Sequence, residues 1–445
     1  MTCAKRLAAR FFYTLILYLL MPYIFLRLLW RARLQPEYLR HVAERFGFYA
    51  HRSDRPVIWL HAVSVGETRA TVSLVEKLRG QYPHHQIVLT HTTPTGRATG
   101  EQLYGDRVTR AYLPYDYPFA VRRFLRHFRP QLGMLMETEI WFNLIRGCRK
   151  NNIPLLLLNA RMSEKSARGY ARFGSLTREA LQALSGIAAQ TEDDAARLSA
   201  LGATRLGALG AEKISVMGNL KFDIAPPVAM LELGKMLRAQ FGAARKVFLA
   251  ASTREGEEAL LLDAWQAAAP ETLLVIVPRH PQRFSEVAEC IVRHGLRMQR
   301  RSGNRPVAAE VQVVLGDSMG EMFAYYAAAD AAFIGGSLLP FGGQNLIEAC
   351  AVGTPVLIGP HTRNFADAAR LADAAGAAKR VSDAAELVAV QQSLLSDENA
   401  LAEMRKAGLR FVAAHRGATD QAMQLISQHL GDEGSRLKTA GPASD

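Results

Sequence analysis

The stretch GGSLLPFGGQNLIEACAVGTPVLIGP, residues 335–360, decides the class of fold. It follows the apolar run 331–334, so its glycines fall where a strand would turn into a helix. A helix beginning near Asn345 would direct the positive end of its dipole toward bound phosphates. Glu348, one turn later, could accept hydrogen bonds from both ribose hydroxyls of a nucleotide. The stretch therefore predicts a nucleotide site, the alternative being a glycine-rich connection without a ligand. Its spacing matches neither G-x-G-x-x-G nor a P-loop, so neither a dehydrogenase nor an ATPase is indicated.

Working outward from this stretch, the chain alternates short apolar runs with helical patterns. Most of the runs are apolar throughout, which favours parallel strands buried on both faces. Strands that alternate with helices indicate βαβ units, so we expect an α/β fold. The expected strands are 57–62, 86–91, 133–136, 154–159 and 186–190 in the first half, and 246–251, 273–277, 311–315, 331–334 and 355–358 in the second.

The length of 445 residues favours two or three domains. The pattern breaks at residues 223–228, DIAPPV, so we expect two doubly wound, Rossmann-like domains facing a cleft. Ligands in such folds bind at the carboxyl ends of the strands. A last long helix is expected at 397–428. The predicted parts are a membrane anchor at 1–34, two Rossmann-like domains at 35–225 and 226–430, and a disordered tail at 431–445; a family resemblance carried by the motifs implies that the first domain binds the acceptor and the second the donor.

The N-terminal segment is apolar and has basic residues on both sides. Residues 11–26, FFYTLILYLLMPYIFL, carry no charge, and residues 1–55 hold ten Lys and Arg against three Asp and Glu. Sixteen helical residues reach roughly 24 Å, short of a hydrocarbon core of about 30 Å. We predict an uncleaved anchor helix that spans the membrane or lies in its interface. The alternatives are a cleaved signal peptide or a buried core helix.

Three motifs in the first half carry candidate catalytic groups. HAVSVGET, 61–68, places Glu67 at the start of a helix, where Ser64 and Glu67 also fit a capping box. METEIW, 136–141, puts Glu137 and Glu139 after a strand, and strand alternation predicts that they point to the same side. The alternative is a pair of solvated loop acids. GNLKFD, 218–223, contains Lys221, which could offset the charge of a leaving phosphate, although this signal is weak alone.

Two further loops follow strands of the second half. In PRHP, 278–281, two prolines bracket Arg279 in a stiff loop suited to phosphate or carboxylate recognition. His280 beside it is more often structural in such a place. GDSMGE, 316–321, opens a helix whose backbone N–H groups could hold an anion. The four cysteines form no CxxC pair, so neither a zinc site nor a redox motif is indicated.

These motifs together resemble a known family. A GGxNxxE stretch followed by GxPVLxGP is similar to the donor-binding half of GT-B glycosyltransferases. The more specific resemblance is to the 3-deoxy-D-manno-octulosonic acid (Kdo) transferases of lipopolysaccharide synthesis. The stretches that carry it are HAVSVGE, METEIW, NARMSEKS, GNLKFD, PRHPQRF, GDSMGE and GGQNLIEACAVGTPVLIGPHTRNF, in this order between residues 57 and 366.

The resemblance implies a role for each matched residue. Glu67 corresponds to the general base, and Glu137 and Lys221 to groups that support the transition state. Gln344 stands where many relatives have His. The resemblance implies no metal and no cofactor. The residues matching the CMP-contacting stretches are Pro278, Arg279, Met319, Gly320, Glu321, Asn345, Leu346, Ile347 and Glu348.

The function implied is that of an inverting glycosyltransferase that moves Kdo from CMP-Kdo to a hydroxyl of a lipid A precursor, lipid IVA. We expect it at the cytoplasmic face of the inner membrane, with an anionic membrane surface as a partner and no nucleic acid. One alternative is another membrane-associated GT-B enzyme that uses a UDP- or ADP-sugar. The other is a nucleotide-sugar-binding module without catalysis.

Overall fold

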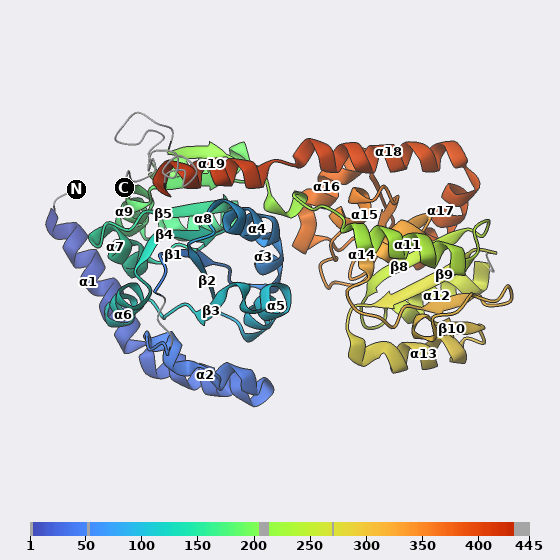
Figure 1. Ribbon diagram of the computed structural model, residues 1–445, viewed down its shortest axis with the longest axis horizontal. Coiled ribbons are helices and arrows are strands. Elements are labelled where there is room, and N and C mark those ends of the chain that lie inside the picture. Colours follow the sequence, from blue (N-terminus) through green and yellow to red (C-terminus); the bar gives the residue numbers. More distant parts are fainter. Residues whose placement is uncertain (1–2, 51–53, 204–212, 269–270, 431–445) are drawn as a thin grey trace, which may run out of the picture. The chain divides into compact units, whose positions relative to one another are not determined.

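The computed structural model describes residues 3–50, 54–203, 213–268 and 271–430 (Figure 1). The chain forms two compact units, the first comprising Met1–Asp223 and Arg416–Asp445 and the second Ile224–His415. Each unit contains one seven-stranded parallel sheet. The predicted α/β fold with two doubly wound domains is confirmed. The tail predicted at 431–445 lies outside the described residues.

The first sheet has the strand order β3-β2-β1-β4-β5-β6-β7. Because β1 lies between β2 and β4, the chain reverses direction across the sheet at β1 and β4, the switch point where doubly wound folds bind ligands. The strands are β1 (Val57–His61), β2 (Gln86–His91), β3 (Thr109–Tyr112), β4 (Pro130–Met136), β5 (Leu155–Ala160), β6 (Gly186–Ala189) and β7 (Ile214–Val216).

Helices cover both faces of this sheet, and each face has its own apolar core. On one face lie α6 (Pro118–Phe128), α7 (Phe142–Lys150), α9 (Gly174–Ala183) and α10 (Glu192–Ala200). On the other lie α3 (Val65–Ala70), α4 (Val72–Gln81), α5 (Pro94–Tyr104) and the last helix, α19 (Ala418–Leu430). The short helices α8 (Glu164–Ala171) and η4 (Leu220–Phe222) complete the unit.

The second sheet repeats the topology, with the order β10-β11-β9-β8-β12-β13-β14 and its switch point between β8 and β12. The strands are β8 (Val247–Thr253), β9 (Leu273–Pro278), β10 (Met298–Arg300), β11 (Val313–Leu315), β12 (Ala331–Ile334), β13 (Val356–Ile358) and β14 (Ala378–Arg380). The helices are α11 (Val228–Phe241), α12 (Glu257–Ala268), α13 (Phe284–Arg293), α14 (Met322–Ala328), α15 (Ile347–Ala351), α16 (Ala366–Ala374), α17 (Ala384–Ser396) and α18 (Glu398–His415).

The C-terminal helical stretch differs from the expectation of one helix over 397–428. It forms two helices, α18 and α19, separated at Gly417, whose φ of 110° a residue with a side chain rarely adopts. Asp223 accepts a hydrogen bond from the Gly417 N–H at 2.7 Å and fixes this break. After it, Ala422 and Ile426 of α19 are buried in the core of the first unit. The second unit therefore ends at His415, short of the expected boundary at 430.

The N-terminal apolar segment forms α1 (Cys3–Leu19) and α2 (Met21–Leu34). Within the described residues no single helix is long and apolar enough to cross a membrane. The pair formed by 8–19 and 21–34, bent by 45°, meets the criteria of length and composition. Large apolar side chains of this segment are exposed, including Phe11 at 65%, Leu19 at 71% and Trp30 at 61%.

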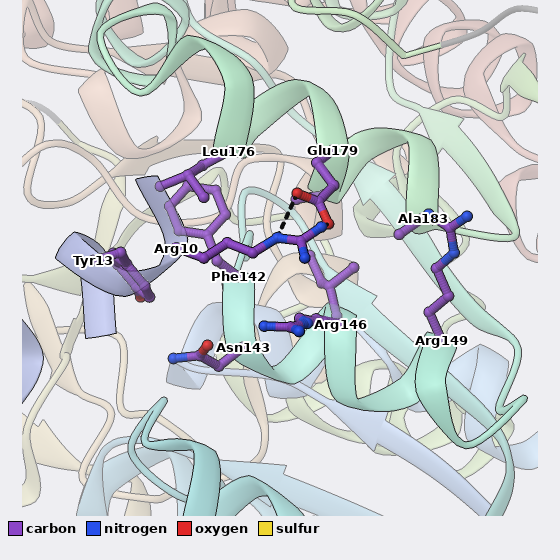
Figure 2. Close-up of a pocket in the computed structure, with 11 residues that line it drawn as sticks. Arg10, Tyr13, Phe142, Asn143, Arg146, Arg149, Leu176, Glu179 and Ala183 are labelled. Carbon is purple, nitrogen blue, oxygen red and sulfur yellow. Dashed lines mark hydrogen bonds and ion pairs between the residues drawn. The ribbon is translucent and has the colours of Figure 1, made fainter. Parts of the chain in front are cut away.

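One side of α1 is fixed to the first unit, as Figure 2 shows. Arg10 donates to Glu179 of α9, with one of the two contacts at 2.8 Å. The Tyr13 hydroxyl donates to the buried carboxylate of Asp116 at 2.9 Å, and the Tyr13 ring packs edge-on against Phe142. The position of α1 is therefore set by polar contacts on one side, while its other side exposes apolar residues.

Candidate active site

In the first unit, the candidate base lies directly after β1, at the switch point. Ser64 caps α3 by accepting the Glu67 N–H at 3.3 Å. The Glu67 carboxylate accepts the Val63 N–H at 2.7 Å and the Ser64 hydroxyl at 3.0 Å. Half of the capping-box alternative is thus present, since Ser64 accepts the Glu67 N–H while the carboxylate accepts the N–H of Val63 where a capping box would use that of Ser64; these contacts hold the carboxyl group in a defined position at the helix start. A capping role and a catalytic role are compatible here.

Glu137 follows β4, the other strand of the switch point. It has a φ of 57°, a left-handed conformation that is uncommon for a residue with a side chain. Strand alternation therefore stops at Met136 and cannot fix the relative direction of Glu137 and Glu139, contrary to the sequence argument. Lys221 of η4 lies 3.4 Å from the Glu137 carboxylate, and each side chain is about one-fifth exposed. The structure thus brings together two of the predicted residues that are far apart in sequence.

Glu139 lies in the same group of carboxylates. Its Oε2 accepts the Trp141 indole N–H at 2.6 Å and lies 3.9 Å from the His61 Nε2. Burial, followed by the charge of His91, lowers the pKa of His61 to about 3, so the imidazole is neutral near pH 7 and this contact is not an ion pair. Burial also raises the pKa of Glu139, against the effect of the Trp141 hydrogen bond.

The carboxylates around Glu67 change its acidity. Burial raises the pKa of Glu67 to about 7, the charge of Glu137 adds to the increase, and the hydrogen bond from Val63 opposes it. A carboxyl group with a pKa near 7 is well matched to general acid–base catalysis at neutral pH. Only the ionised carboxylate can accept a proton from a hydroxyl, and with a pKa of about 7 a substantial fraction of Glu67 is ionised near neutral pH.

In the second unit, the glycine-rich loop after β12 is held by a buried glutamate that the sequence argument did not identify. The Glu257 carboxylate accepts N–H groups from Arg254 at 2.9 Å, Gly336 at 2.6 Å and Leu338 at 3.0 Å. A Cβ on Gly335 would lie 2.4 Å from the Ser252 carbonyl oxygen, so only glycine fits there. The N–H groups of Gly336 and Leu338 are thus bound within the protein.

The predicted nucleotide residues after β9 and β12 lie in two connected pairs. The Arg279 Nε donates to the Gln344 side-chain oxygen at 3.3 Å. Asn345 donates to Glu348 at 3.0 Å and accepts the Ile347 N–H at 3.1 Å. The helix α15 begins at Ile347, not at Asn345, and spans five residues. Its dipole is therefore weaker than expected, and the side chains of these pairs are the main polar groups for a ligand.

The remaining predicted residues follow β9 and β11, which are neighbours in the sheet. Pro278 is the last residue of β9. In the loop after β11, Met319 is 52% exposed and Gly320 has a φ of 82°. Glu321 accepts the Ser318 hydroxyl at 2.6 Å. Parallel strands end at the same edge of a sheet, so the loops after β9, β11 and β12 form one side of the second unit.

A separate pocket lies beside α1 and contains none of the predicted site residues (Figure 2). Arg10 and Tyr13 of α1 face Asn143 and Arg146 of α7 across it, with Glu179 of α9 completing the wall. The pocket is where the N-terminal segment joins the first unit.

Known proteins resemble both parts of the chain. Residues 40–224 match the family described as 3-deoxy-D-manno-octulosonic-acid transferase (kdotransferase), and residues 260–411 match glycosyl transferases group 1. A glycosyltransferase structure from Rickettsia africae aligns with a TM-score of 0.54 at 12% identity, covering 86% of this chain and 100% of that one. This likeness supports the GT-B fold alone.

Two curated relatives align over nearly the whole chain. The 3-deoxy-D-manno-octulosonic acid transferase of Bordetella pertussis is 44% identical over 94% of this chain and 99% of its own length. The enzyme of the same name from Haemophilus influenzae is 36% identical over 95% of this chain and 99% of its own length. The chain is therefore a glycosyltransferase and belongs to the 3-deoxy-D-manno-octulosonic acid transferase family.

Proposed function

We propose that the protein transfers Kdo from CMP-Kdo to a hydroxyl group of a lipid A precursor, lipid IVA, with inversion at the anomeric carbon. The observation that carries the proposal is the arrangement at the switch point of the first unit. There, a partly buried Glu67 with a pKa near 7 neighbours the Glu137–Lys221 ion pair. Family membership supplies the class of donor, and this geometry supplies the groups that the reaction needs.

In the proposed reaction, the acceptor hydroxyl oxygen attacks the anomeric carbon while its proton passes to the Glu67 carboxylate. The bond from that carbon to the phosphate oxygen breaks, and CMP leaves with the bonding electrons. Glu137 stabilises positive charge that develops on the sugar, and Lys221 offsets negative charge on the leaving group. A positioned base contributes typically ~10²–10⁴-fold to the rate.

In the second unit, we propose that CMP contacts the residues after β9, β11 and β12. Arg279 is oriented by Gln344 and is suited to the phosphate. Glu348, held by Asn345, is suited to the ribose hydroxyls. Lys221 and Arg279 provide positive charge for an anionic donor, so we propose that no metal ion is needed.

We also propose that the protein acts at the cytoplasmic face of the inner membrane. More than half of the large apolar side chains exposed in the described chain lie between residues 11 and 34. Arg27, Arg31 and Arg33 lie in or beside this segment and would contact anionic lipid headgroups. In a sedimentation assay, vesicles with anionic lipid should carry the protein down. Replacing Leu19 and Trp30 with Asp should release it.

A transfer assay with CMP-Kdo and lipid IVA, with products weighed by mass spectrometry, tests the proposal. Glu67→Ala should reduce transfer by roughly 10²–10⁴-fold and leave CMP affinity unchanged. Glu101→Ala, an exposed carboxylate on α5, is the matched control and should keep full activity. Inhibition by UDP rather than CMP would contradict the donor, and full activity of Glu67→Ala would contradict the base.

A further inference from the structure

A buried asparagine at the end of β5 has a conformation that invites a functional explanation. Asn159 is 0% exposed and has a φ of 52°. It lies where the register between β5 and β6 shifts, between Leu157 and Ala160. Left-handed backbone is unfavourable for most residues with a side chain and is better tolerated by asparagine, and buried residues held in this region cluster at functional sites.

The Asn159 side chain holds the backbone next to Lys221. Its Oδ1 accepts the Leu220 N–H at 3.1 Å. Because the partner is a backbone donor, the side-chain atom that faces it must be the oxygen, which fixes the amide orientation. The amide Nδ2 is buried and has no hydrogen-bond partner among the described residues. A buried donor without a partner is unfavourable for stability.

The Asn159 backbone reaches the same turn by a second route. Its carbonyl oxygen accepts the Gln190 side-chain amide at 3.0 Å. Gln190 in turn accepts the Asn219 amide at 3.1 Å, and the Asn219 oxygen accepts the Lys221 N–H at 3.0 Å. Two hydrogen-bonded routes therefore run from one residue to η4, the turn that carries Lys221.

The same stretch of backbone also holds Glu137. The carbonyl oxygen of Leu158, immediately before Asn159, accepts the Glu137 N–H at 3.0 Å. Glu137 and Lys221 form their ion pair at 3.4 Å. The bulge at Asn159 is thus the point from which both members of this pair are positioned.

We infer that Asn159 is a positioning residue for the Glu137–Lys221 pair, and so for the chemical step. This inference rests on the proposed function of that pair. A left-handed backbone and an unpartnered buried amide are unfavourable features, and they occur at Asn159, whose side chain holds the turn of Lys221 and which directly follows Leu158, the residue bonded to Glu137. A small displacement of catalytic groups can cost about 100-fold in rate.

The test compares two asparagines of the first unit that share the left-handed conformation. Asn159→Gly keeps that backbone and removes only the amide, while Asn152→Gly makes the same change at an exposed turn with a φ of 53°. We expect Asn159→Gly to lower kcat by roughly 10–100-fold with the KM for CMP-Kdo within about twofold. Hydrogen–deuterium exchange should become faster at residues 217–224. Asn152→Gly should change neither.

Coupling to Lys221 separates positioning from a general loss of stability. In a Lys221→Ala background, Asn159→Gly should lower the residual kcat less than about threefold, because the group that it positions is absent. An equal loss in both backgrounds, or an Asn159→Gly variant with kcat within twofold of the parent, would overturn the inference. Full activity of Lys221→Ala alone would instead contradict the proposed function.

A second variant covers the case in which Asn159→Gly does not fold. Asn219→Ala cuts only the route through Gln190 and leaves the Leu220 N–H on Asn159. We expect it to lower kcat by roughly 3–10-fold and to accelerate exchange at Lys221. An unchanged kcat with accelerated exchange would show that the turn does not need to be held for catalysis, which also overturns the inference.

Discussion

Replacing Glu137 with glutamine should change how kcat/KM depends on pH. The acidic limb of this profile, where kcat/KM falls as the pH falls, should move to lower pH. Glu67 acts as a base only when ionised, so kcat/KM should fall as pH falls through its pKa of about 7. Burial is the largest cause of that raised pKa, and the charge of Glu137 is the next cause that raises it. Removing this charge favours the Glu67 carboxylate and lowers its pKa. The charge of Lys221, no longer balanced by Glu137, acts in the same direction.

The size of the shift follows from Coulomb's law with screening. For a separation taken as about 10 Å, two charges interact by ~1.7 kcal/mol at an effective dielectric of ~20, which corresponds to ~1.2 pKa units. If salt screened the two charges fully, with a Debye length of about 8 Å, roughly a third of this interaction energy would remain. Glu137 is about one-fifth exposed, so the true screening lies between these limits. We expect a shift of roughly 0.4–1.2 pH units.

The measurement is kcat/KM for CMP-Kdo from about pH 5 to 9, with product detected by mass spectrometry. Glu137→Gln should have a lower kcat/KM at every pH. The pH at which the acidic limb lies does not depend on this lower rate, because it reports the pKa of Glu67. Glu139→Gln should shift the limb in the same direction by less, because Glu139 raises the pKa of Glu67 less than Glu137 does. Glu101→Gln removes the same charge from the exposed α5 and should leave the limb in place.

Three results would refute this reasoning. A limb that stays in place in Glu137→Gln would show that Glu67 does not respond to Glu137 or is not the titrating base. An upward shift would contradict the sign of the interaction. An equal shift in Glu101→Gln would indicate an effect of net charge on substrate binding, with no specific role for the carboxylates after β4.

Four further predictions concern the second unit, the anchor and metal dependence. Glu257→Gln should weaken CMP binding at least about tenfold, measured by calorimetry, and lower the free energy of unfolding by ~1–3 kcal/mol, measured by denaturant titration. The reason is that both carboxylate oxygens accept backbone N–H groups, whereas the NH₂ group of an amide cannot accept one. Gly335→Ala should abolish CMP binding, because the added Cβ would lie 2.4 Å from the Ser252 carbonyl oxygen. Gly303→Ala, whose added Cβ would lie 3.9 Å from the Arg305 Nε, is the control and should bind CMP normally in the same titration. Tyr13→Phe should lower the free energy of unfolding by ~1 kcal/mol and speed hydrogen exchange in residues 8–19, where unchanged exchange would argue against the docking role of its hydroxyl. Transfer should keep its rate in EDTA, and recovery of a lost rate on adding Mg²⁺ would contradict the proposed absence of a metal.

The sequence predicted the interior strands of both sheets and missed the edge strands. Each interior strand is buried on both faces and is therefore apolar along its length, which the pattern detects. The four missed strands, β3, β7, β10 and β14, are the outermost strands of their sheets. They are three or four residues long, and two of them contain exposed polar residues, MQR at 298–300 and AKR at 378–380. At a sheet edge only tertiary hydrogen bonds distinguish such segments from a loop.

The candidate site was predictable where its residues belong to one motif. Glu67 and Glu137 were identified because each follows a predicted strand, whereas Lys221 was identified from the stretch GNLKFD just before the linker and from the family resemblance. Glu257 and Asn159 were not identified as site residues, since their roles depend on partners up to 82 residues away in sequence. Acidic residues in the first turn of a helix, such as Glu257 after β8, are common in proteins. Their presence in the sequence therefore does not show that Glu257 holds the loop after β12.

The two units use the same position in the same topology for opposite electrostatic tasks. At the switch point of the first unit, burial and then the charges of the neighbouring carboxylates raise the pKa of Glu67, which favours taking a proton from a neutral hydroxyl. At the switch point of the second unit, the buried carboxylate of Glu257 accepts several backbone N–H groups, and that of the adjacent Glu258 is paired with Arg283 at 2.7 Å, so both are structural supports. The polar groups left for a ligand there include the cationic Arg279, which suits an anionic donor. Exchanging these environments would disable both tasks, because a phosphate would meet carboxylates and the base would lose the neighbours that set its pKa.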